Sequence, residues 1–399
     1  MNDRPPSPLA VANRITSNAL GPYQTATLRI GIAATFLLLL LREWPNRHEL
    51  YGPDGAFHHD LAKARVEATD SFTILVWSDN PLWFELGYLF AIAASVAMVL
   101  GWRVRAVAVL FMLAVLSVHN RNPVVGDGGN NLIHLMSIYL VASRCNQVWA
   151  LDARRRDRNV DGADVTGVVL WCVLGLVLAS VTLLGHLGTV WMVILWILWL
   201  IYVPWWWAQR RGQGELRTVL AMSGNLVHNG ALLVIMMQMC LLYATAGWYK
   251  VQGTRWQDGT AVYYPLQVDA FNPWPALSGL LASHAVLILA LTYGTVLLQV
   301  AFPFTLINRR VKNVVLVLLI AEHLGIAILL GLPFFSLAVI AGDLVFAPTM
   351  ALRRVERAVM SALPGRSRHT AVPRFSHQEA AAPVASVVAR TGSDLRTGH

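Results

Sequence analysis

The sequence predicts an all-α protein, a polytopic integral membrane bundle of about 8–10 transmembrane helices. Of its 399 residues, 56% are hydrophobic and only 13% are charged, whereas a soluble globular domain carries about 25% charged residues. The deficit falls in long uncharged runs, and the chain holds 15 Trp. This composition excludes a water-soluble enzyme, and the apolar content is too high for a disordered or fibrous protein.

The predicted spans are runs of about 20 mostly apolar residues, the length that crosses a bilayer core as a helix. Several runs are short, and the last is interrupted by Pro333 and Asp343, so the count stays between about eight and ten spans. The ten runs are 23–42, 82–101, 103–120, 130–148, 165–185, 188–207, 226–248, 278–302, 311–330 and 332–347.

The basic residues predict the orientation of these spans. In this arrangement, 24 of the 31 Lys and Arg residues fall on the same side as both termini, and 7 fall on the other side. Because cytoplasmic loops are enriched in Lys and Arg, we expect a multi-pass protein of the plasma membrane with both termini in the cytoplasm. The net charge of +9 is then a topology signal. We therefore expect membrane lipid as a partner and no nucleic acid.

Three segments follow from this reading of the chain. We expect a cytoplasmic N-terminal segment at 1–22, a transmembrane domain at 23–350 and a basic, flexible cytoplasmic tail at 351–399. The first segment is polar and shows no pattern of a removable signal peptide. The tail carries eight Arg from Arg353 onward and an Ala/Pro/Ser-rich patch at 380–386, a composition typical of a flexible segment.

No metal site is predicted. Cys145, Cys172 and Cys240 show no CxxC or Cys/His spacing, so a structural zinc site and a disulfide framework are both unexpected. The triplet His58-His59-Asp60 offers metal-ligand side chains, but adjacent His residues rarely converge on one ion. A solvated loop is the favoured interpretation of that triplet.

A loop rich in Asn, Gly and Asp follows the third predicted span. It runs His119-Asn-Arg-Asn-Pro-Val-Val-Gly-Asp-Gly-Gly-Asn-Asn131, on the side opposite the termini. Residues of these types form tight turns with side-chain hydrogen bonds, which favours an ordered cap between two spans. The other interpretation is the rim of a binding site, with the candidate residues Arg121, Asn122, Asp127, Asn130 and Asn131.

Lys250 ends an apolar run on that same side, between Tyr249 and Val251. Burial disfavours a charged ammonium, and a neutral lysine amine is a competent general base. A Lys at a helix end also snorkels toward the interface as an anchor, and spacing alone favours this second interpretation. The neighbours Trp248, Tyr249 and Trp256 are candidate residues of a binding site.

Ionisable residues inside predicted spans are costly in a bilayer and are therefore functional candidates. The pair Glu322-His323 is the best placed, in an otherwise apolar run. Adjacent helical positions point about 100° apart, so the two need not pair with each other. A packing role for His323 is an equally good interpretation. The full set is Glu85, His119, His134, His228, His284, Glu322, His323 and Asp343.

Two motifs are the most distinctive in the chain. One is the run Ser117–Asn131, which ends near Trp149-Ala-Leu-Asp152; the other is Ala246-Gly-Trp-Tyr-Lys250, followed by Trp256, Gly259 and Tyr263. Together they resemble bacterial members of the HTTM (horizontally transferred transmembrane domain) family, over residues 20–350. That family includes the membrane part of vitamin K-dependent gamma-carboxylase.

The resemblance implies a quinol-dependent carboxylase/epoxidase-like lyase. In the carboxylases, an Ala-Gly-x-x-Lys segment carries the Lys taken as the base for a reduced naphthoquinone of the vitamin K or menaquinol type, and Lys250 falls on that Lys. Oxygen then yields a strong base that abstracts a proton from a peptide Glu, and carbon dioxide adds. A His early in a late helix is similar in position to His323. The resemblance thus implies Lys250 and His323 as catalytic residues acting on a small secreted peptide or protein on the extracytoplasmic side.

Two features depart from the carboxylase pattern. After Asn130-Asn131 the carboxylases carry a His, whereas this sequence has Leu132 and its nearest His is His134. The carboxylases also continue into a large extracytoplasmic domain, where this chain has its Arg-rich tail.

Two other functions stay open. Short bacterial members of the family include a factor that matures a secreted peptide toxin, the sporulation-delaying protein. The alternative is therefore a non-enzymatic maturation or export factor for a small secreted peptide. Transport is a third hypothesis, disfavoured because no internal repeat is visible.

Overall fold

The computed structural model describes residues 7–157, 165–211 and 214–362. Helices account for 82% of the structure, and no β-strand occurs within these ranges. The all-α prediction is confirmed. By length and apolar composition, eight of the described helices could each cross a membrane, or nine if one bent pair counts as a single span.

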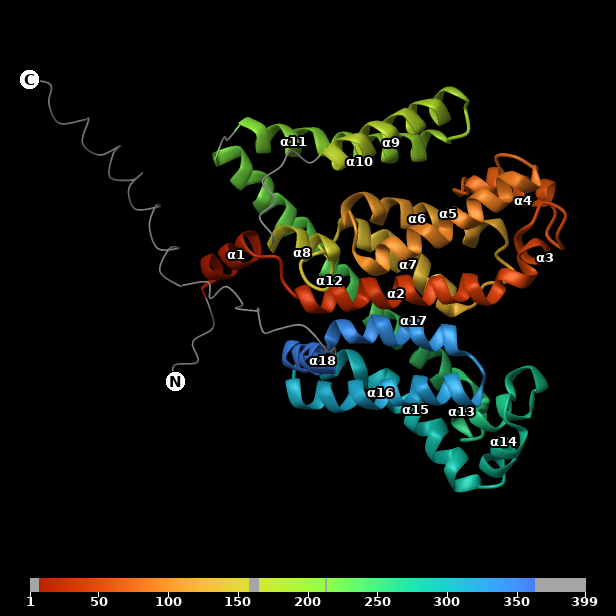
Figure 1. The fold of residues 1–399 in the computed structure, drawn as a ribbon. Helices are drawn as coiled ribbons and strands as arrows, with labels where there is room; N and C mark the ends of the chain where they lie inside the picture. Colours follow the sequence, from red (N-terminus) through yellow and green to blue (C-terminus); the bar gives the residue numbers. More distant parts are fainter. Residues whose placement is uncertain (1–6, 158–164, 212–213, 363–399) are drawn as a thin grey trace, which may run out of the picture. The chain divides into compact units, whose positions relative to one another are not determined.

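The long helices run side by side, and neighbours in the chain pack against each other (Figure 1). Helix α2 packs on α5 and α17, α5 on α6, α6 on α7, α12 on α15, α15 on α16, and α16 on α17. Most of the connections are short, as expected for neighbours that run in opposite directions. The bounds are α2 Pro22–Glu43, α5 Pro81–Leu100, α6 Val104–Arg121, α7 Gly128–Ala142, α12 Gly214–Gln252, α15 Ala285–Thr305, α16 Arg309–Leu329 and α17 Pro333–Asp343.

Shorter elements gather at the two ends of this bundle (Figure 1). Helices α1 (Pro8–Ser17) and α8 (Leu151–Asp157) lie at the end where α2, α6 and α16 begin. We call this the basic end, because α6 is preceded there by Arg103 and α16 begins there with Arg309 and Arg310. The opposite end is called the loop end. It holds η1 (Trp44–Asn46), α3 (Arg47–Tyr51), α4 (His59–Thr69), η2 (Ile74–Val76), α13 (Thr254–Gln257), η3 (Ala261–Tyr263), η4 (Pro265–Gln267), η5 (Asp269–Phe271) and α14 (Pro275–Ala282).

Helices α9 (Val165–Leu183), α10 (Thr189–Leu200) and α11 (Tyr202–Arg211) form an outlying apolar hairpin. The rings of Trp171 and Trp199 stack with centroids 4.2 Å apart, and each indole N–H donates to the backbone carbonyl of the other residue. Gly175 makes room for this pair, since a Cβ there would lie 2.5 Å from the Trp199 ring. The hairpin reaches the bundle through Trp191, whose ring lies 5.2 Å from that of Phe72.

Most predicted spans match a helix within a few residues, but several differ in length or continuity. The run 188–207 is divided between α10 and α11, and the run 332–347 is α17 followed by the 3-10 turn η6 (Leu344–Phe346). The run 278–302 is divided between α14 and α15, because Ser283 and His284 direct side-chain hydrogen bonds to the carbonyl of Leu280 and interrupt the helix. The run 130–148 is helical only to Ala142. The run 226–248 is the inner part of the 39-residue α12.

The predicted tail also differs in part. Residues 351–362 are helical and belong to α18 (Thr349–Ala362). The short turn η6 precedes this helix. The remainder of the tail, 363–399, lies outside the described residues.

Arg29 connects three elements from inside the bundle. It lies in α2, and its side chain is fully buried. Nε donates to the carbonyl of Cys145 at 3.1 Å, Nη1 to those of Met98 and Val99, and Nη2 to that of Trp149 at 2.7 Å. Carbonyls in the last turn of a helix lack partners within the helix, and a cation there is favoured by the helix dipole. Arg29 therefore holds α2, the end of α5 and the segment after α7 together.

Replacing Arg29 by Met should lower the melting temperature markedly. Four carbonyls lose the Arg29 donor, and of these Met98 keeps the backbone N–H of Gly101. Each buried acceptor left unpartnered costs about 1–3 kcal/mol. The effect is measured by heating the protein in detergent and monitoring how readily the buried Cys145 thiol is labelled as the protein unfolds. Cys172→Ser and Cys240→Ser remove the other two thiols. Arg14→Met on the exposed face of α1 is the matched control. Equal melting temperatures for the two variants would contradict the structural role of Arg29.

Candidate functional site

A row of polar side chains crosses the contact between α12, α15 and α16. Lys250 Nζ donates to Gln299 Oε1 at 2.8 Å, and Gln299 Nε2 donates to Glu322 Oε1 at 2.7 Å. The three residues come one from each helix, and Gln299 is buried. Polar groups inside an apolar bundle need such partners, so this row fixes how the three helices face each other.

Gly247 explains why Lys250 meets Gln299. A Cβ at this position would lie 2.7 Å from the Val300 side chain and 3.2 Å from the Val300 backbone nitrogen. Only glycine lets α12 approach α15 this closely. Lys250 follows Gly247 by three residues and lies on the same helix face. The close approach of the two helices therefore brings its ammonium beside Gln299, the residue before Val300. The Ala-Gly-x-x-Lys spacing thus has a physical basis in this fold.

Trp256 covers Lys250 from the loop end. After α12 the chain turns at Gly253 and enters α13, which places the Trp256 ring with its centroid 5.2 Å from Lys250 Nζ. A cation over an indole face is attracted by the ring electrons. The Lys250 nitrogen therefore lies between an uncharged amide oxygen and an aromatic face, with no carboxylate hydrogen-bonded to it.

His323 is buried beside Glu322. Among the residues that the structure describes, neither of its ring nitrogens has a hydrogen-bond partner, and neither does Oε2 of Glu322 or Oγ of Ser336 on the adjoining α17. The His323 ring lies 5.7 Å from the Phe335 ring and 6.3 Å from the Tyr243 ring. Unpartnered polar atoms this deep in a structure indicate a place for a polar ligand or for water.

Tyr243 and Asp343 form the innermost pair. The Tyr243 hydroxyl lies 2.9 Å and 2.8 Å from the two carboxylate oxygens of Asp343, and both side chains are buried. Tyr243 precedes Lys250 by seven residues, which is about two helical turns and the same face of α12. We call the six residues the buried polar cluster: Tyr243, Lys250, Gln299, Glu322, His323 and Asp343.

The structure brings some of the predicted site residues together and separates others. Lys250 and His323 both belong to the buried polar cluster, and Trp256 covers it. Trp248 and Tyr249 lie on the outer face of α12, where their side chains are 63% and 74% exposed. They face away from the cluster and toward whatever surrounds the bundle.

The loop 119–131 acts mainly as a cap. Arg121 donates to the carbonyls of Gly52 and Phe57, and Asn122 Nδ2 donates to that of Leu50 at 2.8 Å. These bonds tie the long loop after α2 to the end of α6. The structure thus supports the cap interpretation for these two residues.

The second half of that loop starts α7. Asp127 caps the helix, because its Oδ1 accepts from the backbone nitrogen of Asn130 at 3.0 Å. Asn130 is partly exposed and Asn131 is exposed. Gly129 packs so closely on Phe335 that a Cβ would lie 2.6 Å from the Phe335 Cα. Phe335 also contacts His323, so the loop reaches the cluster through that one ring.

Sequence reasoning did not single out Tyr243 or Gln299. The functional candidates inside the predicted spans were ionisable residues, whereas the side chain of Gln299 is neutral. The signal for Gln299 was present all the same, as an amide in an apolar run needs a hydrogen-bond partner. For Tyr243 the signal was its seven-residue spacing from Lys250.

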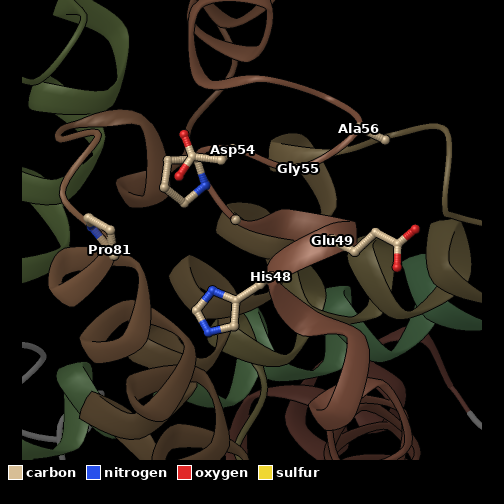
Figure 2. Close-up of a pocket in the computed structure, with 8 residues that line it drawn as sticks. His48, Glu49, Asp54, Gly55, Ala56 and Pro81 are labelled. Atoms are coloured by element: carbon tan, nitrogen blue, oxygen red, sulfur yellow. The ribbon is translucent and has the colours of Figure 1, made fainter.

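Two pockets lie away from the cluster. The first, of 480 Å³, is open and lies at the loop end among His48, Glu49, Asp54 and Pro81. Figure 2 shows the Glu49 carboxylate pointing away from His48 and Asp54. His48 Nε2 lies 2.7 Å from Glu85 Oε1, which also pairs with Arg47. These acidic groups therefore do not converge on one point.

The second pocket, of 270 Å³, is an apolar groove between α2 and α17. Within the described ranges, no group of three or more His, Cys, Asp or Glu side chains could hold a metal ion.

Comparison with known proteins adds no assignment: no family model, no curated protein and no solved structure matches this chain. The function has to be argued from the residues of the cluster.

Replacing Tyr243 by Phe should destabilise the bundle, because it leaves the buried Asp343 carboxyl without its hydroxyl donor. A buried polar group left without its hydrogen-bond partner costs about 1–3 kcal/mol. Denaturant unfolding of Tyr243→Phe, Asp343→Leu and the double variant measures the coupling between the two side chains. Tyr263→Phe, on a partly exposed tyrosine of η3, is the control. Additive effects of the two single changes would argue against the pair.

Proposed function

We propose that this chain is a multi-pass protein of the plasma membrane with both termini in the cytoplasm. Helix α9 supports membrane insertion, because its apolar stretch has a mean hydropathy of 2.3 and only 6% of it is buried by the rest of the chain. An exposed apolar surface of that length is stable in lipid and not in water. The gathering of Lys and Arg at the basic end supports this orientation, in which the loop end lies on the extracytoplasmic side.

The function that this geometry supports best is a quinol-dependent, carboxylase/epoxidase-like enzyme that modifies a small secreted peptide or protein. The carrying observation is the placement of Lys250. Its nitrogen is held at 2.8 Å by the uncharged Gln299, in the same cluster as a His323 whose two ring nitrogens are unpartnered. A positioned amine near the extracytoplasmic side, next to unsatisfied polar atoms, is the arrangement that a general base requires.

A reduced naphthoquinone of the vitamin K or menaquinol type fits the residues around His323. The nitrogens of His323 and Oε2 of Glu322 are buried without partners, and a quinol carries two hydroxyls that need such partners. Phe335 and Tyr243 offer aromatic faces for a flat ring. When bound, the quinol together with molecular oxygen supplies the strong base that removal of an unactivated peptide proton requires.

Two side chains of the cluster have different roles in proton transfer, because Lys250 accepts the proton and Gln299 positions Lys250. Lys250, in its neutral form, takes a proton from a hydroxyl beside it. Gln299 turns its carbonyl oxygen toward Lys250 because its amide N–H₂ is engaged by Glu322. A carboxylate in direct contact would hold the amine protonated, whereas the intervening amide positions Lys250 and leaves it able to alternate between its two forms.

The surroundings of the cluster suit this chemistry. Phe302 and Phe346 lie against each other with ring centroids 5.0 Å apart, and Phe302 also packs on Tyr243. Such apolar walls exclude water, which would otherwise quench a strong base.

Replacing Lys250 by Ala should abolish epoxide formation from reduced menaquinone by purified protein supplied with oxygen and carbon dioxide. Loss of a general base lowers the rate about 10²–10⁴-fold. The product is followed by chromatography. Lys63→Ala, on the exposed face of α4, is the matched control and should keep full activity. Folded protein that makes no epoxide, or that loses nothing on Lys250→Ala, contradicts this function and points to the non-enzymatic maturation factor. Solute uptake by proteoliposomes would point to transport instead.

Replacing Gln299 by Leu should lower kcat about tenfold or more and change KM for the quinol less, because it removes the acceptor that positions Lys250 without removing the base. Gln267→Leu, on an exposed glutamine of η4, should leave both constants unchanged. A Gln299→Leu enzyme with normal kcat would show that Lys250 needs no positioning by α15.

A further inference from the structure

Helix α18 is amphipathic, with an apolar arc and a basic arc. At about 100° per residue, Ala351, Val355, Ala358, Val359 and Ala362 fall within an arc of about 100°. Val355 and Val359 in this arc are 56% and 54% exposed. The basic arc holds Arg353 and Arg357 nearly opposite the apolar arc and Arg354 about 90° from its centre.

The start of α18 is fixed at the basic end of the bundle. Gln24 Nε2 donates to the carbonyl of Ala347 and to Thr349 Oγ1, both at 2.9 Å. Lys312 Nζ donates to the carbonyl of Phe346. Gln24 and Lys312 lie in the first turns of α2 and α16, which both begin at the basic end. The first residue of α18 is therefore held where those spans leave the apolar region.

We propose that α18 is a lipid-binding helix that lies on the cytoplasmic leaflet and takes anionic phospholipid headgroups on its basic arc. A helix with an apolar arc and Arg on the other face lies in the interface plane with its apolar side toward the acyl chains. The cytoplasmic leaflet is negatively charged and attracts basic segments next to a span. Guanidinium groups bind phosphate with two parallel hydrogen bonds. The inference rests on the membrane placement proposed above and is independent of quinol chemistry.

Charge and size favour lipid over other partners. The apolar arc consists of three Ala and two Val, so it offers little area for a stable contact with a second copy of the chain. Three Arg against the single Glu356 leave the helix net positive, which suits a surface of negative charge. Each basic residue near an anionic membrane strengthens binding about fivefold, so three give about a hundredfold.

Hydrogen exchange of the full-length protein tests the proposal. The protein is placed in nanodiscs of phosphatidylcholine alone or of phosphatidylcholine with phosphatidylglycerol, and exchange of the amides of 349–362 is followed by mass spectrometry. We expect slower exchange in the discs with phosphatidylglycerol, and a smaller difference at high salt because salt screens the attraction. The variant R353Q/R354Q/R357Q should lose the difference, while R353K/R354K/R357K keeps it.

Three outcomes would overturn the proposal. Equal exchange of 349–362 in the two lipids would show that the headgroup charge is not recognised. Protection that persists in detergent would show that α18 packs on its own bundle, and protection that rises with protein density at constant lipid would show contact between copies. Unaltered exchange of α2 and α16 in every variant confirms that the fold is intact. A chain that is not a membrane protein fails earlier, at incorporation into the discs, so that failure is distinguishable.

Discussion

The bundle depends on how polar groups inside apolar helices find partners, and Arg29 is the strongest case. A buried guanidinium that donates to four carbonyls joins α2, the last turn of α5 and the segment after α7. No water competes for these carbonyls in an apolar environment, so the bonds are strong and their loss is costly. At the other end of α6, Arg121 does the same for the long loop after α2. The two arginines thus fix the positions of α2 and α6 from opposite ends.

The buried polar cluster follows the same constraint with a different result. Lys250, Gln299 and Glu322 satisfy each other across three helices, but His323 and one oxygen of Glu322 stay unpartnered. Each of the three nitrogens of Arg29 donates a hydrogen bond, whereas the ring nitrogens of His323 have no partner among the described residues. This difference separates His323 from Arg29. It is one reason for our proposal that Lys250 is a base, in place of the anchor that spacing alone favoured.

Much of the fold could be predicted, because apolar runs and their lengths are local properties of the chain. The errors lie where side chains redirect the backbone, as at His284, or where a polar turn ends a helix early, as after Ala142. In the candidate site, Lys250 and His323 were predicted and lie in one cluster, while Trp248 and Tyr249 share the local sequence of Lys250 but face outward. Adjacent helical residues point about 100° apart, so proximity in sequence does not decide which of them faces inward.

The sequence by itself determined the class of the fold, the positions of the long helices, the basic bias of one end and the residues most unusual for their surroundings. The tertiary structure decided which of those residues meet. Gln299 lies 49 positions from Lys250, and Asp343 lies 100 positions from Tyr243, so no periodicity connects them. Their contact depends on the rotation and depth of each helix, which close packing sets at points such as Gly247 against Val300. Hydropathy measures how apolar a helix is, but only packing decides which polar groups share its interior.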